Sequence, residues 1–138
     1  MKKWSSSWKS SKQPRKQRKY VYNAPLHIKR KMMAAHLSKE LREKYGIRSL
    51  PIRKGDQVII MRGKFKGTTG KVEKVFTKQM RVGIDTAKIT TKSGQKVYAK
   101  IRPSALMIIS FDTSDKKRLE KLNKLAERNK TIQSQSNA

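Results

Sequence analysis

The spacing of apolar residues changes at Pro51, where a helical period gives way to a strand-like one. Within residues 23–50, apolar residues recur three or four positions apart in "NAPLHIKRKMMAAHL" and again in "KELREKY". Pro25 suits the first turn of the first segment, Ser38 can cap the second, and Gly46 can end it in a left-handed conformation. We therefore predict two short helices in this part of the chain.

Residues 51–110 carry short runs rich in β-branched residues, separated by glycine and proline turns. The runs are "DQVIIMR", "KVEKVF", "QMRVGI", "KITT", "KVYAKI" and "LMIIS". About six short strands in so little chain predict a mainly β fold that closes into a small barrel, because closure hides the edges of the strands.

The two ends of the chain have a different texture. Residues 1–22 are mostly Ser, Lys, Arg and Gln, with too few apolar residues to offset the entropy of ordering. At the other end, the spacing of leucines from Thr113 to Arg128 predicts one amphipathic helix followed by a frayed polar tail. The expected organisation is a basic extended arm (1–22) that is disordered without RNA, a short-helix extension (23–50), the barrel (51–110), and a C-terminal helix with its tail (111–138).

Charge narrows the possible partners. The 138 residues include 36 Lys and Arg but 9 Asp and Glu, a formal net charge of +27. Such a chain repels itself unless a polyanion neutralises it. A membrane surface is disfavoured because no segment joins a long apolar helical face to a basic one. The sequence contains no cysteine and shows no secretory signal, so we expect a cytoplasmic protein without disulfides. We also expect it to bind nucleic acid and not to form homo-oligomers.

The segment "KGDQVIIMRGKFKGTTGKVEKVF", residues 54–76, contains two Gly-Lys pairs that suggest a nucleotide site. A phosphate-binding P-loop needs a glycine five positions before such a pair and Ser or Thr after it. Neither the pair at Gly63 nor the pair at Gly70 meets this spacing. The glycines, Gly67 included, instead indicate a hairpin turn in which they adopt positive φ angles. Phe65 at its tip either stacks on an RNA base or folds back onto the core.

The remaining candidates for chemistry are weak. His27 and His36 lie nine residues apart without nearby cysteine, which matches no metal-ligand spacing. Asp56 is better explained as a turn or strand-entry residue than as a general base. No set of residues indicates nucleophilic catalysis, so we expect no enzyme activity, no metal and no cofactor.

Residues 54–76 resemble a KOW motif, the glycine-centred hairpin of SH3-like barrels in ribosomal proteins and transcription elongation factors. The preceding "LSKELREKYGIRSLPIRKGD" and the later "IRPSALMI" resemble one family in particular. That family is the universal large-subunit ribosomal protein numbered twenty-four in bacteria and twenty-six in eukaryotes, in its archaeal and eukaryotic form, with "KQPRKQRK" closer to the archaeal one. The similarity runs from Lys12 to Arg128, and the segment with Trp4 and Trp8 does not take part in it.

The resemblance implies a structural protein that binds large-subunit ribosomal RNA in its 5′ domain, assists assembly, and lies near the nascent-peptide exit tunnel. Its partners would be this RNA, neighbouring ribosomal proteins and nascent-chain factors. Two alternatives are a KOW-type transcription elongation module that contacts RNA polymerase and a non-specific nucleic-acid-packaging protein.

The expected RNA contacts combine cations for phosphates with aromatic rings for bases. Of the three successive cations at positions 29 to 31, we expect two to reach phosphate and one to face solvent. The full set is Lys12, Arg15, Lys16, Arg18, Lys19, Tyr20, Tyr22, His27, Lys29, Arg30, Lys31, Arg62, Lys64, Phe65, Lys66, Lys71, Lys92 and Arg102.

Overall fold

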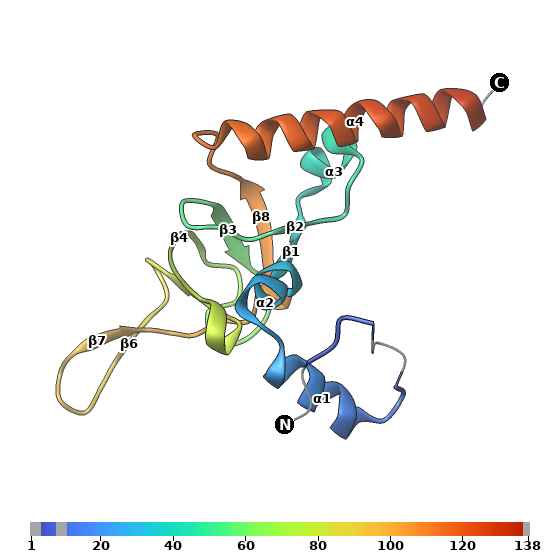
Figure 1. Cartoon of the computed structure of the whole chain (residues 1–138). Coiled ribbons are helices and arrows are strands. Elements are labelled where there is room, and N and C mark those ends of the chain that lie inside the picture. The colour runs from blue at the N-terminus through green and yellow to red at the C-terminus, as the bar shows by residue number, and fades with distance from the viewer. Residues whose placement is uncertain (1–3, 8–10, 137–138) are drawn as a thin grey trace.

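The computed structural model describes residues 4–7 and 11–136 of the chain, and it shows a curved sheet flanked by helices (Figure 1). The helices are α1 (Pro14–Asn23), α2 (Leu26–Met32), α3 (Lys39–Tyr45) and α4 (Lys116–Ser136), with short 3₁₀ turns η1 (Thr77–Gln79) and η2 (Pro103–Ala105). The strands are β1 (Ala34–Leu37), β2 (Ser49–Pro51), β3 (Gln57–Ile60), β4 (Thr69–Phe76), β5 (Arg81–Ile84), β6 (Lys88–Thr90), β7 (Lys96–Tyr98) and β8 (Leu106–Ser110).

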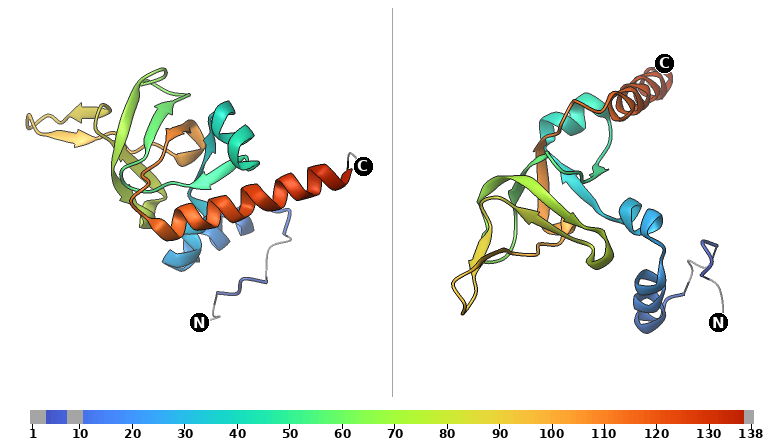
Figure 2. Two further views of the ribbon diagram at one scale, coloured as in Figure 1. Left: turned by 90° about the horizontal axis from the view of Figure 1, so that it is seen from above. Right: turned by 60° about the vertical axis from the view of Figure 1, so that its left-hand side comes forward.

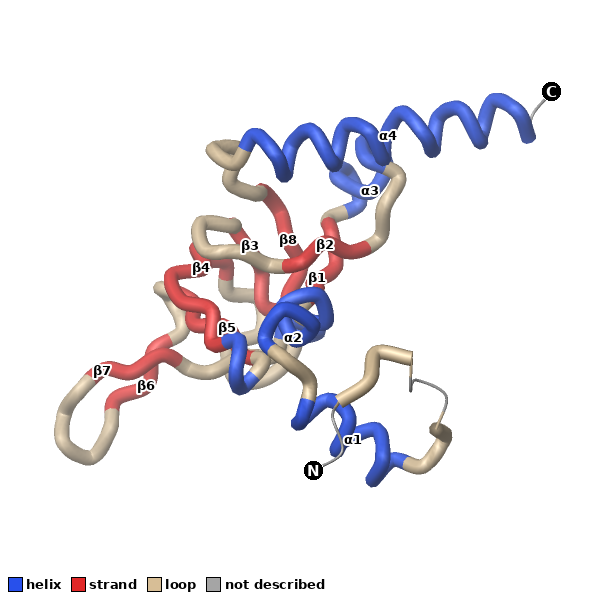
Figure 3. Tube along the Cα trace, in the orientation of Figure 1, coloured by secondary structure: helices blue, strands red, loops and turns tan. Residues whose placement is uncertain are grey.

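Six strands form one sheet in the order β2-β1-β8-β3-β4-β5. β1 and β8 are parallel, and the other neighbours are antiparallel. β6 and β7 form a separate hairpin that projects from the body (Figures 1 and 3). Within the described residues no ladder joins the edge strands β2 and β5, so the architecture is mixed α/β with an open hydrogen-bonded sheet, where the sequence predicted a mainly β barrel.

The core of the protein is mostly aliphatic, with Tyr45 and Phe111 as aromatic members. Leu37, Val58, Ile60, Leu106 and Ile108 are fully buried or nearly so, and they come from β1, β3 and β8 at the centre of the sheet. Toward one end of the sheet, α3 and α4 lie side by side (Figures 1 and 2). Their apolar side chains join the same cluster, so the long helix is packed onto the body by its first half.

A buried ion pair ties α4 to the loop before β3. The Asp56 carboxylate, with no exposed surface, accepts hydrogen bonds from both terminal nitrogens of Arg118 at 2.6 and 2.8 Å. The same carboxylate accepts bonds from the backbone N–H groups of Arg53 at 2.9 Å and Asp112 at 3.3 Å. Four donors thus satisfy one buried carboxylate. Asp56 is a structural residue at the entry to a strand, as predicted, and no local pattern indicates its partner 62 residues away.

Several elements confirm the sequence-based predictions. α3 begins after Ser38, whose hydroxyl accepts a bond from the Leu41 N–H at 3.4 Å, and it ends at Gly46 with φ 64°. The glycine segment turns β3 into β4, and Gly63 and Gly67 have φ 98° and 85°. Gly70 differs from the prediction because its φ is not positive. A Cβ there would overlap the side chains of residues 84–86, so close packing requires this glycine.

Three segments differ from the expectations. Residues 34–37 form a strand although "AAHL" follows the helical spacing before it, because pairing with both β2 and β8 outweighs local propensity. Residues 14–23 are helical rather than extended, with Pro14 in the first turn. α4 continues to Ser136, beyond the predicted end at Arg128. Whether the arm is disordered without RNA stays a prediction, and Trp8 lies outside the described residues.

Candidate RNA interface

The glycine loop between β3 and β4 carries exposed cations over an apolar base. Lys64 and Lys66 are exposed, whereas Phe65 is half-buried and packs against the core. The structure therefore favours the interpretation in which the ring of Phe65 folds back onto the core over the one in which it stacks on an RNA base. A Cβ added to Gly63 or Gly67 would meet no atom within 4 Å, so these two glycines are required by their positive φ angles and not by close packing.

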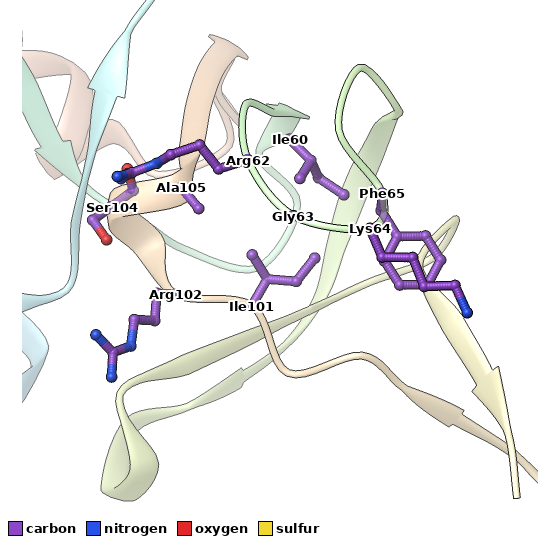
Figure 4. A pocket seen from close by; sticks show the side chains of 9 residues that line it. All are labelled: Ile60, Arg62, Gly63, Lys64, Phe65, Ile101, Arg102, Ser104 and Ala105. Carbon is purple, nitrogen blue, oxygen red and sulfur yellow. The ribbon is translucent and has the colours of Figure 1, made fainter.

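A shallow groove of about 400 Å³ lies between this loop and the segment before β8 (Figure 4). Ile60 and Ile101 lie between the two sides of the groove, with Lys64 and Phe65 at one end and the arginines at the other. Arg62 donates to the Ser104 carbonyl at 2.7 Å, which holds its guanidinium beside η2. The outer part of that guanidinium stays exposed and can still reach an anion.

A second, larger groove of about 720 Å³ lies between α1, α2, η1 and η2. Five cations line it, and apart from Lys29 they come from four separate segments: Arg18, Lys78, Arg81 and Arg102. Arg102 and Ser104 line both grooves, so the two cavities adjoin. They form one continuous basic track, which we define as Arg62, Lys64, Arg102, Arg81, Lys78 and Arg18.

Lys29 plays a different part from the one predicted. Its side chain is buried, and its ammonium donates to the carbonyls of Tyr22 at 2.9 Å and Lys78 at 3.4 Å. It also lies 5.7 Å from the centre of the Tyr22 ring. Its charge thus links the end of α1 to η1. The neighbouring Arg30 and Lys31 are exposed, and whether they reach phosphate stays a prediction, whereas Lys29 is buried although all three cations were expected to face outward.

Among the other predicted contacts, Tyr22 also lines the larger groove, whereas the rest are spread over the surface outside the two grooves. Lys12 precedes α1, and the cations of α1 are exposed, as is His27 on α2. Tyr20 lies against Trp4, with ring centres 4.9 Å apart, while the Tyr22 side chain is 80% exposed. Lys71 is exposed on β4, and Lys92 lies at the tip of the β6–β7 hairpin. Their contacts with RNA stay predictions.

The projecting hairpin is fixed to the sheet at its base. Tyr98 donates its phenol proton to Glu73 at 2.6 Å, and this bond raises the pKa of Tyr98 above its usual value. Gly83 lies beneath the ring, where a Cβ would come within 2.9 Å of it. Lys88 adds an ion pair to Glu73 at 3.6 Å. The hairpin that carries Lys92 at its tip is therefore attached firmly to the sheet.

Lys78 and Arg81 were missed by the sequence-based reasoning. Lys78 lies within the turn η1 and Arg81 begins β5, and both face the groove because α2 packs against that turn and α1 lines the same groove. The one local signal was their charge, which they share with 34 other Lys and Arg residues (36 less these two). Long-range packing, which one sequence does not reveal, brings them to the track.

Nothing in the described part of the chain points to a catalytic or metal centre. No group of three His, Cys, Asp or Glu side chains is placed to hold a metal ion among these residues. No helix described here is both long and apolar enough to cross a membrane. Burial together with the nearby Arg118 and Arg30 lowers the pKa of Arg53, which reflects the crowding of cations around a structural ion pair.

A glycine loop with exposed cations, a continuous basic track and basic helices around a small sheet are the features of the class of nucleic-acid-binding proteins. Residues 11–125 match the family described as the eukaryotic ribosomal proteins L26 and their archaeal counterparts numbered twenty-four. The large ribosomal subunit protein uL24 of Pyrobaculum islandicum is 52% identical over 107 residues, which cover 78% of this chain and 87% of that protein. The chain belongs to this ribosomal protein family.

Family membership confirms the resemblance found from the KOW-like segment and the helix that precedes it. It also confirms that the protein is a ribosomal component and not an enzyme. The alternatives of an elongation module and a packaging protein have no support beyond shared charge and the shared hairpin.

Proposed function

We propose that the protein binds large-subunit ribosomal RNA through the basic track and the exposed cations of its first two helices. The observation that carries this proposal is the track itself, in which six cations from the glycine loop, α1, η1, β5 and the segment before β8 line two adjoining grooves. No acidic residue lines either groove, and every lining residue belongs to the described part of the chain. The phosphate backbone of a nucleic acid is the ligand that such a surface fits.

The finer assignments follow the family resemblance. We infer that the curved sheet is the small SH3-like barrel of the KOW family, drawn together by the single bridge between Val82 and Ile101 in place of a full ladder. The protein would bind the 5′ domain of the RNA during assembly and lie near the exit tunnel, beside neighbouring ribosomal proteins and nascent-chain factors. The spread of its cations over several elements suits the joining of separate RNA segments.

The test is the affinity of the full-length protein for transcribed large-subunit RNA across a series of salt concentrations. With about 6 to 10 phosphates neutralised, the logarithm of affinity should fall with the logarithm of salt at a slope of several units. Arg102→Gln, in the shared part of the track, should reduce this slope by about one unit. The matched control is Lys39→Gln, at the start of α3 near the opposite end of the sheet (Figure 1).

A slope close to zero would contradict the proposal, as would equal losses from the two variants. Separate transcripts of the 5′ domain and of another domain distinguish the finer assignment, because the finer assignment requires tighter binding to the 5′ domain. Sedimentation of the native protein with the large subunit after a moderate salt wash tests its place in the particle.

A further inference from the structure

The larger groove combines an apolar lining with a basic rim, and phosphate binding alone does not account for the apolar part. Met32, Met80 and the ring of Tyr22 line it together with the cations of the track. Met32 and Tyr22 are among the large apolar side chains that the fold leaves exposed, at 36% and 80%. Exposed apolar surface between cations fits a ligand that is itself part apolar and part anionic.

We propose that this groove holds one unpaired base of the bound RNA, with the flanking phosphates on its rim. The proposal rests on the proposed function, because the ligand is a nucleotide within the same RNA. A volume of about 720 Å³ lies within the range of roughly 300 to 1,000 Å³ typical of small-molecule sites. It therefore has room for a base together with its sugar.

The chemistry of the lining selects an unpaired base over a duplex. In a duplex the faces of the bases are stacked on one another, so the groove would meet sugars, phosphates and base edges but no base face. A base turned out of its stack offers a flat apolar face, and the Tyr22 ring and the polarisable methionine sulfurs are suited to it. Arg18 and Arg81 can then pair with phosphates on either side.

Contacts within the protein join two walls of the groove. The buried ammonium of Lys29 bonds to a carbonyl at the end of α1 and to one in η1, so a single side chain joins two of its walls. Met80, which follows η1, is the one non-glycine residue with positive φ among those described, at 53°. Such a conformation is uncommon for a residue of this kind and tends to persist at binding sites. It sets the methionine between the core and the groove.

The experiment compares three RNA probes by fluorescence anisotropy with the full-length protein at one salt concentration. They are an octamer of adenosine, a ribose-phosphate oligomer of equal length without bases, and an RNA duplex with the same number of phosphates. The adenosine octamer should bind at least about five-fold more tightly than the abasic oligomer, as expected for one stacked base. Equal affinities for these two single strands would overturn the proposal.

Variants assign the preference to the groove. Tyr22→Ala changes an exposed side chain, so the fold should persist, and it should remove most of the preference for bases while leaving the abasic oligomer bound as before. Leu26→Ala is the matched control, since Leu26 is 56% exposed on α2 but does not line the groove. Arg81→Gln should weaken all three probes together. A Tyr22→Ala variant that lost affinity equally for every probe, or kept the full preference, would overturn the proposal.

The two proposals fail in different ways. Loss of the base preference with intact, salt-dependent binding to large-subunit RNA would refute the groove and leave the ribosomal role in place. Absence of binding to that RNA would refute the role itself. In the RNA complex, dimethyl sulfate should show one unpaired base protected by the native protein and modified again with Tyr22→Ala, while hydroxyl-radical cleavage should show unchanged protection of the backbone.

Discussion

Replacing Asp56 with Asn should be among the most destabilising conservative changes in this protein. The substitution keeps the volume of the side chain but removes the charge opposite Arg118, whose side chain is 5% exposed. The guanidinium would then lie buried without a counter-ion, and two backbone N–H groups would compete for one remaining acceptor. Breaking a buried ion pair at one partner typically costs about 3 to 5 kcal/mol.

Asp115→Asn is a control with the same chemical change on the same ion-pair network. Asp115 pairs with Arg53 at the surface, where the two side chains are 37% and 39% exposed. It also accepts a bond from the Arg118 N–H at the start of α4, a role that asparagine can keep. An exposed pair of this kind contributes up to about 1 kcal/mol.

Urea unfolding followed by far-ultraviolet circular dichroism measures both variants. With a slope of roughly 2 kcal/mol per molar urea, a loss of about 4 kcal/mol shifts the midpoint by about 2 M. Asp115→Asn should shift it by less than about 0.5 M. If the two variants unfolded at the same midpoint, burial would not determine the strength of these pairs and the reasoning would be refuted.

Three further changes follow from single contacts. Gly70→Ala should lower the free energy of unfolding by about 1 to 3 kcal/mol, because the added Cβ would overlap side chains at the end of β5. Urea titration measures this loss. Thr69→Ala, at the exposed neighbouring position, is the control and should cost less. Lys29→Met should lower the melting temperature yet leave the salt slope of RNA binding intact, whereas Arg30→Met should do the reverse. Because its bond to Glu73 raises its pKa, the Tyr98 phenol should ionise above pH 10.0 in an absorbance titration. Its contribution to stability should be complete below that pH and lost as the pH rises through the folded-state pKa, and Tyr98→Phe should abolish this late step.

Local signals were sufficient where neighbouring residues determine the structure. The ends of α3 at Ser38 and Gly46 were predictable because capping and left-handed termination depend on a few adjacent residues. The hairpin at Gly63 and Gly67 was predictable for the same reason, since the turn requires positive φ at those positions. The strands that follow alternate or cluster β-branched residues, and their pairing partners are near in sequence.

Long-range contacts explain the failures. β1 exists because Ala35 and Leu37 are buried between strands from either side of the sheet, and no property of "AAHL" indicates that pairing. Lys29 could not be separated from Arg30 by residue type, because only the fold determines which cation faces η1. The same limit applies to the candidate site, where Lys78 and Arg81 joined the track through packing alone.

The distribution of the acids explains how so basic a chain can fold and still present an uninterrupted cationic surface. Of nine acidic residues, at least five bind groups of the protein itself: Asp56, Glu73, Asp85, Asp112 and Asp115. Asp85, for example, accepts the Lys71 N–H at 2.8 Å beside Gly70, and the bond from the Ser114 N–H lowers the pKa of Asp112. These carboxylates fix loops and the start of α4, and none of them lines either groove of the track. Because no carboxylate opposes them in the grooves, the cations of the track keep their attraction for phosphate, while Arg118 and Arg53 pair with the structural carboxylates.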